Sequence, residues 1–454
     1  MHDNPGRRNL IALANVSGIS KNCFTSSLDL KSHPLVHSNL NLKSRYYTAL
    51  AYVVHECTTD SEYGNTRLAQ YKELLARDNT KLSKADTIED LKKLCADFPG
   101  LLARKYLYCL ICDIALILVD KPAIDQAFVL LAKAIKRKPL KKISAGYDFL
   151  FNREALSRVF SHSACLVAQF RANQNFLAQL EKRFLVVANM SSGKSTLINA
   201  LVGKPLTQTA QAACTANLCH IYNKPSEDGA THLLSSSLNL DASYRDLMQV
   251  EKQNVNYIAT FFRTLHEIKA RICIIDTPGV NSAIHIEHCA LTKAAVKDEK
   301  YDKLIYLFNA AYLGTNDEHQ LLSFITENVP ESKILFVVNK IDTFNTDEDS
   351  IEESIEGIRS DLLEIGYTKP VICPLSARFA LLLKRAQSGD ALSENECEEF
   401  VLYSKQFSRP EYDLSHYYDL CEFPQTSESN YAKLAKKSGL EGIENILFGG
   451  LNEQ

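Results

Sequence analysis

The sequence lacks a charge excess of either sign, and no repeat of fixed period stands out in it. Its 51 lysines and arginines nearly balance 54 aspartates and glutamates, and the formal net charge is -3. A strongly basic surface is what draws a protein to nucleic acids without sequence preference. A chain this close to neutrality therefore carries no clear nucleic-acid signal.

Long hydrophobic runs are also missing. The longest apolar stretch, residues 106–120, is too short to span a bilayer and contains Asp113, which favours a buried helix. The N-terminal residues lack the apolar core and cleavage site of a secretory signal. The 13 cysteines are odd in number and scattered, which is typical of reduced thiols in a cytosol. We therefore expect a cytoplasmic protein that meets membranes only peripherally.

Residues 184–203 contain the most informative pattern in the chain. An apolar run over 184–188 enters a short loop that ends in Gly193-Lys194-Ser195, and a helix-like run follows. This is the context of a phosphate-binding loop, in which backbone amides and the helix N-terminus face the phosphates. We expect Lys194 to reach the β- and γ-phosphates and the Ser195 hydroxyl to ligate Mg²⁺. The predicted phosphate-binding residues are Ser191, Ser192, Gly193, Lys194, Ser195 and Thr196.

A second apolar run, residues 333–342, ends in the letters NKID and predicts the base. A carboxylate at Asp342 accepts hydrogen bonds from the N1–H and 2-amino groups of guanine. Adenine has neither donor and would leave a buried charge unpaired. We expect Asn339 to tie this loop to the phosphate loop and the stem of Lys340 to cover the base. The sequence thus predicts GTP rather than ATP.

Two further strand-like segments complete the pattern. In RICIIDTPG, residues 271–279, the strand ends at Asp276, which is placed to hold Mg²⁺. Gly279 follows, with its N–H placed to meet the γ-phosphate. PVICPLSAR supplies Ser376 and Ala377, whose backbone is expected to contact the guanine oxygen. Each of these short motifs is weak evidence by itself. All of them in GTPase order, each after an apolar strand, predict a GTP-binding domain that uses Mg²⁺.

Together these motifs resemble those of GTPases of the dynamin superfamily, most closely in its bacterial form. The run SSGKSTLINALVG is similar to that family's phosphate loop and first helix. Residues 305–325 are similar to the strand, loop and helix that precede its guanine motif. The long gap between Ser195 and Asp276 leaves room for the insertions that dynamin-like domains carry. The resemblance covers residues 180–450.

The resemblance implies roles for two more residues. Segment 205–221 is similar to the family's first switch and has Thr215 in place of the threonine that contacts Mg²⁺ and the attacking water. Lys194 and Thr215 are therefore the implied catalytic residues. Met190 stands where eukaryotic dynamins place a catalytic glutamine, and a thioether cannot orient water, so hydrolysis by a monomer is expected to be slow. The implied Mg²⁺ ligands are Ser195, Thr215 and Asp276.

The expected fold is α/β, with a P-loop GTPase domain built on a mainly parallel sheet flanked by helices and preceded by an α-helical domain. Residues 1–40 are polar and expected to be partly flexible, 41–180 form the helical domain, and 181–454 form the GTPase domain. Residues 389–435, with weak periodicity, are expected to be a surface insertion. Apolar spacing predicts helices at 44–58, 66–77, 87–97, 101–119, 123–138 and 152–180, and Pro139 is expected to end the fifth of them.

The function that follows is GTP binding and hydrolysis, a phosphoric anhydride hydrolase activity. By resemblance, the nucleotide state would drive homodimerisation through the GTPase domains and movement of the N-terminal helices in a membrane-associated or scaffold process in a bacterial cytoplasm. Residues 133–142 contain six basic residues in ten. This segment is either a solvated helix end or a patch that binds anionic lipid.

The alternative function is a GTP-gated binding module with little turnover that docks a protein or RNA partner.

Overall fold

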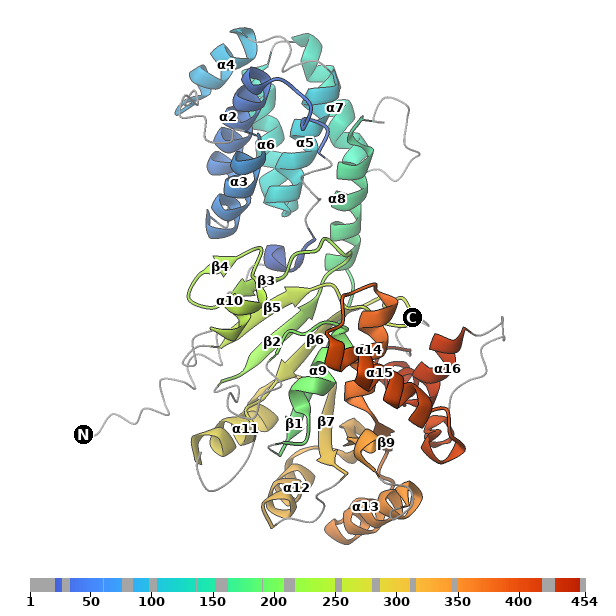
Figure 1. The fold of residues 1–454 in the computed structure, drawn as a ribbon. Coiled ribbons are helices and arrows are strands. Elements are labelled where there is room, and N and C mark those ends of the chain that lie inside the picture. Colours follow the sequence, from blue (N-terminus) through green and yellow to red (C-terminus); the bar gives the residue numbers. More distant parts are fainter. Residues whose placement is uncertain are drawn as a thin grey trace, which may run out of the picture.

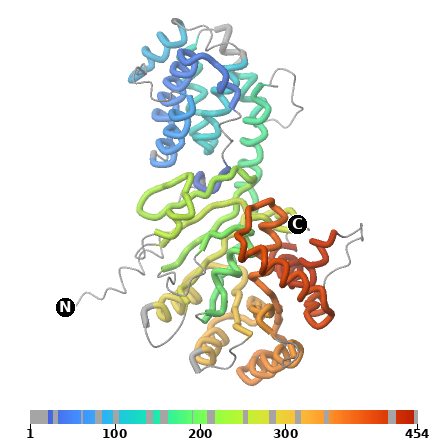
Figure 2. Tube along the Cα trace, viewed as in Figure 1, coloured from blue at the N-terminus to red at the C-terminus, as the bar shows by residue number. Residues whose placement is uncertain are grey.

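The computed structural model describes residues 21–26, 33–59, 61–75, 85–97, 104–135, 137–151, 162–189, 191–207, 217–249, 255–279, 286–310, 316–344, 350–418 and 429–449. The molecule is elongated (Figure 1): a group of helices forms one end, a twisted sheet occupies the middle, and further helices cover the sheet and form the other end. From the helical part the chain enters the sheet through α8 (Ala164–Leu177) (Figure 2).

The helical part packs around its own apolar core. A short 3₁₀ helix, η2 (Lys21–Phe24), precedes it in the chain. Its helices are α2 (Leu40–Cys57), α3 (Ser61–Leu75), α4 (Ile88–Asp97), α5 (Arg104–Leu118), α6 (Lys121–Ala134), α7 (Arg137–Phe151) and α8. Asn39 starts α2 by accepting a hydrogen bond from the Leu42 amide at 2.8 Å, as an N-cap does. The inward faces of these helices form one contiguous cluster of buried residues.

The buried helix expected around Asp113 is confirmed as α5. Asp113 is fully buried, which would be costly for an unpartnered carboxylate. Its side chain accepts hydrogen bonds from the hydroxyls of Tyr46 and Tyr71, the latter at 2.9 Å, and lies 2.9 Å from Nε2 of His33. These partners allow an acidic residue to stand inside an otherwise apolar helix.

One helix was missed by the sequence pattern. Pro139 was expected to end a helix over 123–138, but α6 ends at Ala134 and Pro139 lies in the first turn of α7. Proline fits a first turn because the amide it lacks has no partner inside the helix there. The expected helix over 152–180 is described only as α8, since 152–161 lie outside the described residues.

The sheet has nine strands among the described residues, in the order β4-β3-β5-β2-β6-β1-β7-β8-β9. Their bounds are β1 (Glu181–Ala188), β2 (Cys219–Asn223), β3 (His232–Leu234), β4 (Leu238–Asn239), β5 (Asn256–Thr260), β6 (Arg271–Asp276), β7 (Lys303–Asn309), β8 (Ile334–Asn339) and β9 (Ile372–Leu375). The five strands from β6 to β9 run parallel, while β2 is antiparallel to β6 and β3 to β4 and β5. The mainly parallel sheet is thus as predicted.

Helices cover both faces of the sheet. They are α9 (Lys194–Val202), α10 (Tyr244–Met248), α11 (Ile286–Asp298), α12 (Asn316–Asn328), α13 (Ile351–Ile365), α14 (Ala377–Gln387), α15 (Glu394–Gln406), α16 (Asn430–Lys437) and α17 (Leu440–Phe448). Shorter 3₁₀ turns are η6 (Glu331–Lys333), η7 (Ile341–Thr343), η8 (Pro410–Tyr412) and η9 (Ser415–Tyr417). Along β1, Leu185 and Val187 join the core under α11, α12 and α13, whereas Phe184 and Val186 join the core under α9 and α17. Burial on both faces explains why the second part of β1, residues 184–188, is apolar at every position.

Residues 21–26 connect the helical part to the sheet. The Phe24 ring stacks on Tyr222 of β2 at 4.1 Å between centroids. Ser26 donates its amide to Asn173 of α8 at 3.2 Å and its hydroxyl to the Ser226 carbonyl at 2.7 Å. This part of the segment expected to be partly flexible is therefore packed between the two parts of the molecule.

None of the described helices is both long and apolar enough to cross a bilayer.

Candidate functional site

The predicted phosphate loop lies between the end of β1 and the start of α9. Gly193 is the N-cap of α9 with a φ of 89°, a backbone conformation that glycine adopts without strain. Ser191 also has a positive φ, 63°. The Ser192 hydroxyl donates to the Asn189 carbonyl at 2.5 Å, which closes the loop on itself. The loop is thus a tight turn at a helix N-terminus, the geometry that presents amides to an anion.

Lys194 and Asp276 form a buried ion pair at the centre of this site. Lys194 is the first residue of α9, and Asp276 ends β6, whose register pairs it with Val186 of β1. The two side chains contact each other directly and are 8% and 0% exposed. Buried charges are costly unless they are paired. An arriving phosphate and cation would supply each with a partner of opposite charge.

Asn339 links the phosphate loop to both base loops. It ends β8, and its Nδ2 donates to the Ser192 carbonyl at 2.9 Å, while its Oδ1 accepts from the Ala377 amide at 3.0 Å. A Cβ on Gly193 would lie 2.3 Å from this Nδ2, so the loop passes too close for any side chain there. One asparagine therefore sets the spacing of three loops.

The predicted base loops face each other. The Ser376 hydroxyl donates to Oδ1 of Asp342 at 2.5 Å, and Ser376 also caps α14 by accepting from the Phe379 amide. Burial raises the pKa of Asp342 above its usual value of 3.8, against the opposing effect of the Ser376 hydrogen bond. Lys340, between Asn339 and Asp342, has a φ of 69°. The carboxylate is thus held beside the start of α14, where the sequence predicts the base.

The structure describes the turn after β6, which contains the predicted DTPG motif. Gly279 lies just after β6, and the Thr277 hydroxyl donates to the Val186 carbonyl at 2.8 Å, which ties this turn to β1. Met190 and Thr215 lie outside the described residues.

Sequence reasoning missed Asn199, which anchors the chain where it leaves α9. Its Oδ1 accepts the amides of Leu206 and Thr207 at 2.9 and 3.0 Å, and its Nδ2 donates to the Thr207 carbonyl at 3.0 Å. Thr207 also donates its hydroxyl to the Ser195 carbonyl at 3.2 Å. The available signal was a polar residue inside an apolar helix, where it is 1% exposed.

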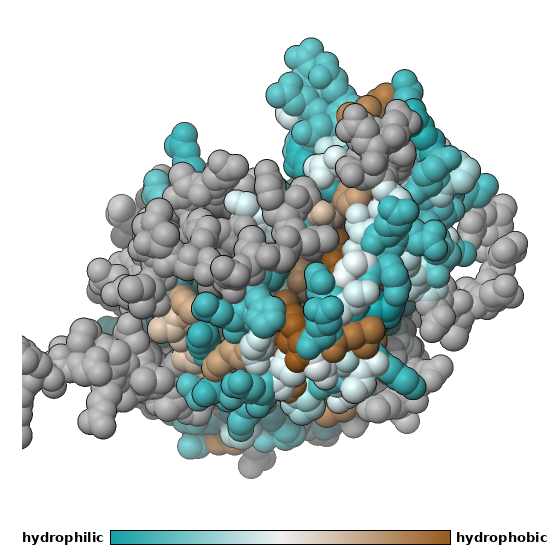
Figure 3. Space-filling view, turned by 90° about the horizontal axis from the view of Figure 1, so that it is seen from below, coloured by the Kyte–Doolittle hydropathy of each residue, from teal (hydrophilic) through white to brown (hydrophobic). Residues whose placement is uncertain are grey.

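All of the predicted site residues that the structure describes meet at one edge of the sheet. β1, β6, β8 and β9 are parallel, so their carboxyl ends place the four predicted loops together. This edge faces the end of the molecule away from the α2–α7 helices (Figure 1). A space-filling view from below shows hydrophobic residues gathered in the middle of that face, with hydrophilic ones around them (Figure 3).

This fold and site define a P-loop GTPase domain: a phosphate loop at a helix N-terminus, a strand-end aspartate beside its lysine, and an asparagine that joins it to a base loop. Residues 184–342 match the model of the dynamin family. This part of the chain is a dynamin-family GTPase domain.

Three curated proteins are similar to the chain over part of its length. It is 28% identical over 243 residues to an uncharacterized protein in the xynA 3′ region of Caldicellulosiruptor sp. (strain Rt8B.4), which covers 50% of this chain and 56% of that protein. It is 26% identical to a probable transmembrane GTPase, FZO-like, chloroplastic, of Arabidopsis thaliana, over 60% of this chain and 29% of that protein. It is 26% identical to dynamin-like protein A of Bacillus subtilis (strain 168), over 40% of this chain and 15% of that protein. The matches thus span about half or less of these relatives.

Proposed function

We propose that the protein binds GTP with Mg²⁺ and hydrolyses it slowly, by in-line attack of water on the γ-phosphate. The observation that supports this proposal is the Asn339 bridge, whose side chain bonds to both the phosphate loop and the Ser376-Ala377 loop. Asp342 then accepts from the guanine N1–H and 2-amino groups, and Lys194 neutralises the β- and γ-phosphates.

The donor set fits Mg²⁺. Asp276 offers a fully buried carboxylate, and Ser195 offers a hydroxyl in the first turn of α9. Oxygen ligands of this kind, with waters and phosphate oxygens, are what Mg²⁺ prefers. The metal supplies charge neutralisation at the phosphates when it is bound. The chain's own contribution is the phosphate-loop amides and Lys194, which stabilise developing charge, and Thr215, which positions the water.

The wider role that we propose is a nucleotide-driven change of shape. Residues 41–180 act as a helical domain and 181–454 as the GTPase domain with 389–435 inserted, and GTP binding drives dimerisation across the GTPase faces and movement of the helices. Separate apolar cores in the helical part and on the two sheet faces support this division. The name of the Arabidopsis relative, a probable transmembrane GTPase, supports a role at membranes. For this chain we propose a peripheral contact from the cytoplasm. The alternative is a GTP-gated module that docks a protein or RNA partner with little turnover.

Titration with fluorescent GTP and ATP tests nucleotide binding. Wild-type protein is expected to bind GTP and not ATP, and Lys194→Ala to lose most GTP affinity while staying folded. Lys369→Ala, which removes an exposed lysine away from the phosphate loop, is the matched control. Equal GTP affinity in the Lys194→Ala and control proteins would contradict the site.

Turnover per molecule, measured from nanomolar to micromolar protein, tests the mechanism. Because Met190 replaces a water-orienting glutamine, the rate is expected to be slow at low concentration and to rise with self-association. Thr215→Ala is expected to abolish hydrolysis and keep much of the GTP binding. A fast rate that stays flat on dilution would show that one chain holds a complete catalytic site.

Co-sedimentation with anionic liposomes, with and without GTP, separates the two wider roles. GTP-dependent sedimentation supports the membrane role. Absence of sedimentation at every nucleotide state favours the docking module.

A further inference from the structure

The segment after α14 reaches back to the loop that is expected to read the base. Gln406, at the end of α15, donates from Nε2 to the Asp342 carbonyl at 3.1 Å. Tyr412, in η8, donates its hydroxyl to the Phe344 carbonyl at 2.7 Å. The two acceptors flank the end of η7, so this single turn is held from outside at two points.

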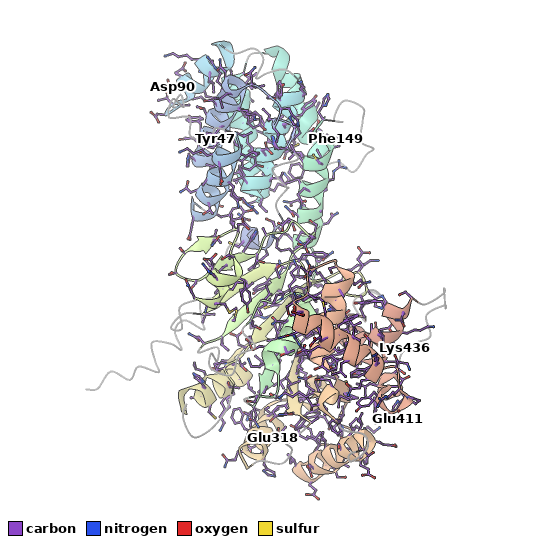
Figure 4. The ribbon with its side chains drawn as sticks, viewed as in Figure 1. Tyr47, Asp90, Phe149, Glu318, Glu411 and Lys436 are labelled. Carbon is purple, nitrogen blue, oxygen red and sulfur yellow. The ribbon has the colours of Figure 1, made fainter. Side chains whose placement is uncertain are left out.

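The same segment also supports the Ser376-Ala377 loop. Phe407, which is fully buried, stacks on Phe379 of α14 with ring centroids 5.1 Å apart. The Arg378 guanidinium donates to the Glu399 carboxylate at 2.7 Å. The C-terminal helices form a layer along one side of the molecule, with Glu411 of η8 and Lys436 of α16 marked on it (Figure 4). Both base loops are therefore attached to one supporting element.

The base loop needs such support. Lys340 has a φ of 69°, and a residue other than glycine pays about 1–2 kcal/mol in that region. Strain of this kind persists only where neighbouring contacts hold it. Inside the loop, the Thr343 hydroxyl donates to the Lys340 carbonyl at 2.8 Å. Gln406 and Tyr412 add two hydrogen bonds from outside the nucleotide-binding motifs.

We propose that Gln406 and Tyr412 are positioning residues for base selection, and that the segment 394–412 acts as a brace that sets the direction of the Asp342 carboxylate. This inference rests on the proposed GTP binding. Neither residue touches the base. Each acts through a backbone carbonyl beside Asp342, so losing either contact lets the carboxylate drift from the two guanine donors that it must meet together.

Dissociation constants for GTP and for inosine triphosphate test the brace. Hypoxanthine keeps the N1–H and lacks the 2-amino group, so the ratio of the two constants reports how well Asp342 meets both donors. In Gln406→Met, which keeps the side-chain length and removes the donor without adding a charge beside Asp342, and in Tyr412→Phe, which removes only the hydroxyl, the preference for GTP is expected to fall about threefold for each, the effect of one net hydrogen bond. Lys405→Ala, at an exposed position next to Gln406, is the control and is expected to keep the wild-type ratio.

A general loss of stability would lower the folded fraction and leave the ratio of the two constants unchanged. An unchanged ratio in both folded variants, with a wild-type protein that prefers GTP, overturns the brace and leaves the proposed function standing. A wild-type protein that does not prefer GTP overturns both. If one variant fails to fold, the ratio in the other decides.

Discussion

Asp342 is the residue to which we assign base choice in the proposed function. Its carboxylate accepts a hydrogen bond from the Ser376 hydroxyl at 2.5 Å, and burial raises its pKa. A buried acceptor pair favours a ligand with two matching donors and rejects one that leaves it unpaired.

Replacing Asp342 with Asn exchanges a double acceptor for one acceptor and one donor. The preference is expected to move from GTP towards xanthosine triphosphate, whose base offers the complementary pattern. Hydrogen bonds to a charged group are worth about 1.5–3 kcal/mol, so GTP affinity is expected to fall at least about tenfold. Competition titrations with both nucleotides measure this. Wild-type binding of ATP as tightly as GTP would contradict the role of Asp342.

GTP affinity is expected to depend on pH through the same residue. Asp342 accepts both guanine donors only when ionised, and its pKa in the free protein is raised above 3.8. Binding is therefore unaffected well above the raised pKa and weakens as the pH falls through it, by up to about tenfold per unit. Comparing wild type with Asp342→Asn removes the titration of the phosphates themselves. Parallel pH profiles in the two proteins would show that another group is responsible.

At the scale of elements, the predicted phosphate loop lies close against the end of β8. The loop and the β8 end are joined by the Asn339 side chain, and α9 follows with its N-terminus open to the site. The brace formed by α15 and η8 does the same for the base loop. Each loop thus takes its shape from an element far away in the chain.

Gly193→Ala is expected to abolish nucleotide binding and to destabilise the fold. The new Cβ would lie 2.3 Å from Asn339 Nδ2, and the φ of 89° adds about 1–2 kcal/mol of strain. Gly229→Ala is the matched control, because its φ is 72° and nothing lies within 4 Å of the added Cβ. It carries the strain alone and is expected to bind GTP normally. Thermal unfolding and GTP titration measure both effects. Normal GTP binding by Gly193→Ala would mean that the loop does not close on Asn339.

On the scale of the whole molecule, residues 21–26 fasten the helical part to the sheet. Asn173 of α8 exchanges two hydrogen bonds with Ser26, accepting its amide at 3.2 Å and donating to its carbonyl at 3.1 Å. Ser26 in turn accepts the Ser226 amide at 3.1 Å on the sheet side. If the helices move relative to the GTPase domain, either these hydrogen bonds break or residues 21–26 move with the helices.

Asn173→Ala is expected to loosen this connection. It leaves a buried amide and a buried carbonyl without their side-chain partner, at a cost of about 1–3 kcal/mol. Amide hydrogen exchange of residues 21–26 should become faster, and the unfolding temperature should fall. Asn328→Ala, which removes an exposed side-chain bond at the end of α12, is the control. Unchanged exchange in Asn173→Ala would show that the contact does not hold the two parts together.

Much of the nucleotide site could be predicted from the sequence because each motif is short and follows an apolar strand. Lys194, Asp276, Asn339 and Asp342 each stand at a strand end or helix start that local pattern locates, and parallel strands bring such ends together. The proline at 139 misled the helix prediction, because proline fits the start of one helix as well as the limit of another.

The sequence by itself thus determined the GTPase class, the sheet type and which strand ends lie together, since these depend on local order and on burial of apolar strands. Only the tertiary structure decided what holds the site in shape. Gln406 is 64 positions from the carbonyl it binds, Tyr412 is 68 from its acceptor, and Ser26 is 200 from Ser226. Hydrogen bonds between polar side chains and distant backbone carbonyls leave no periodic pattern in a sequence. These hydrogen bonds form only when packing of the folded chain brings the two residues together.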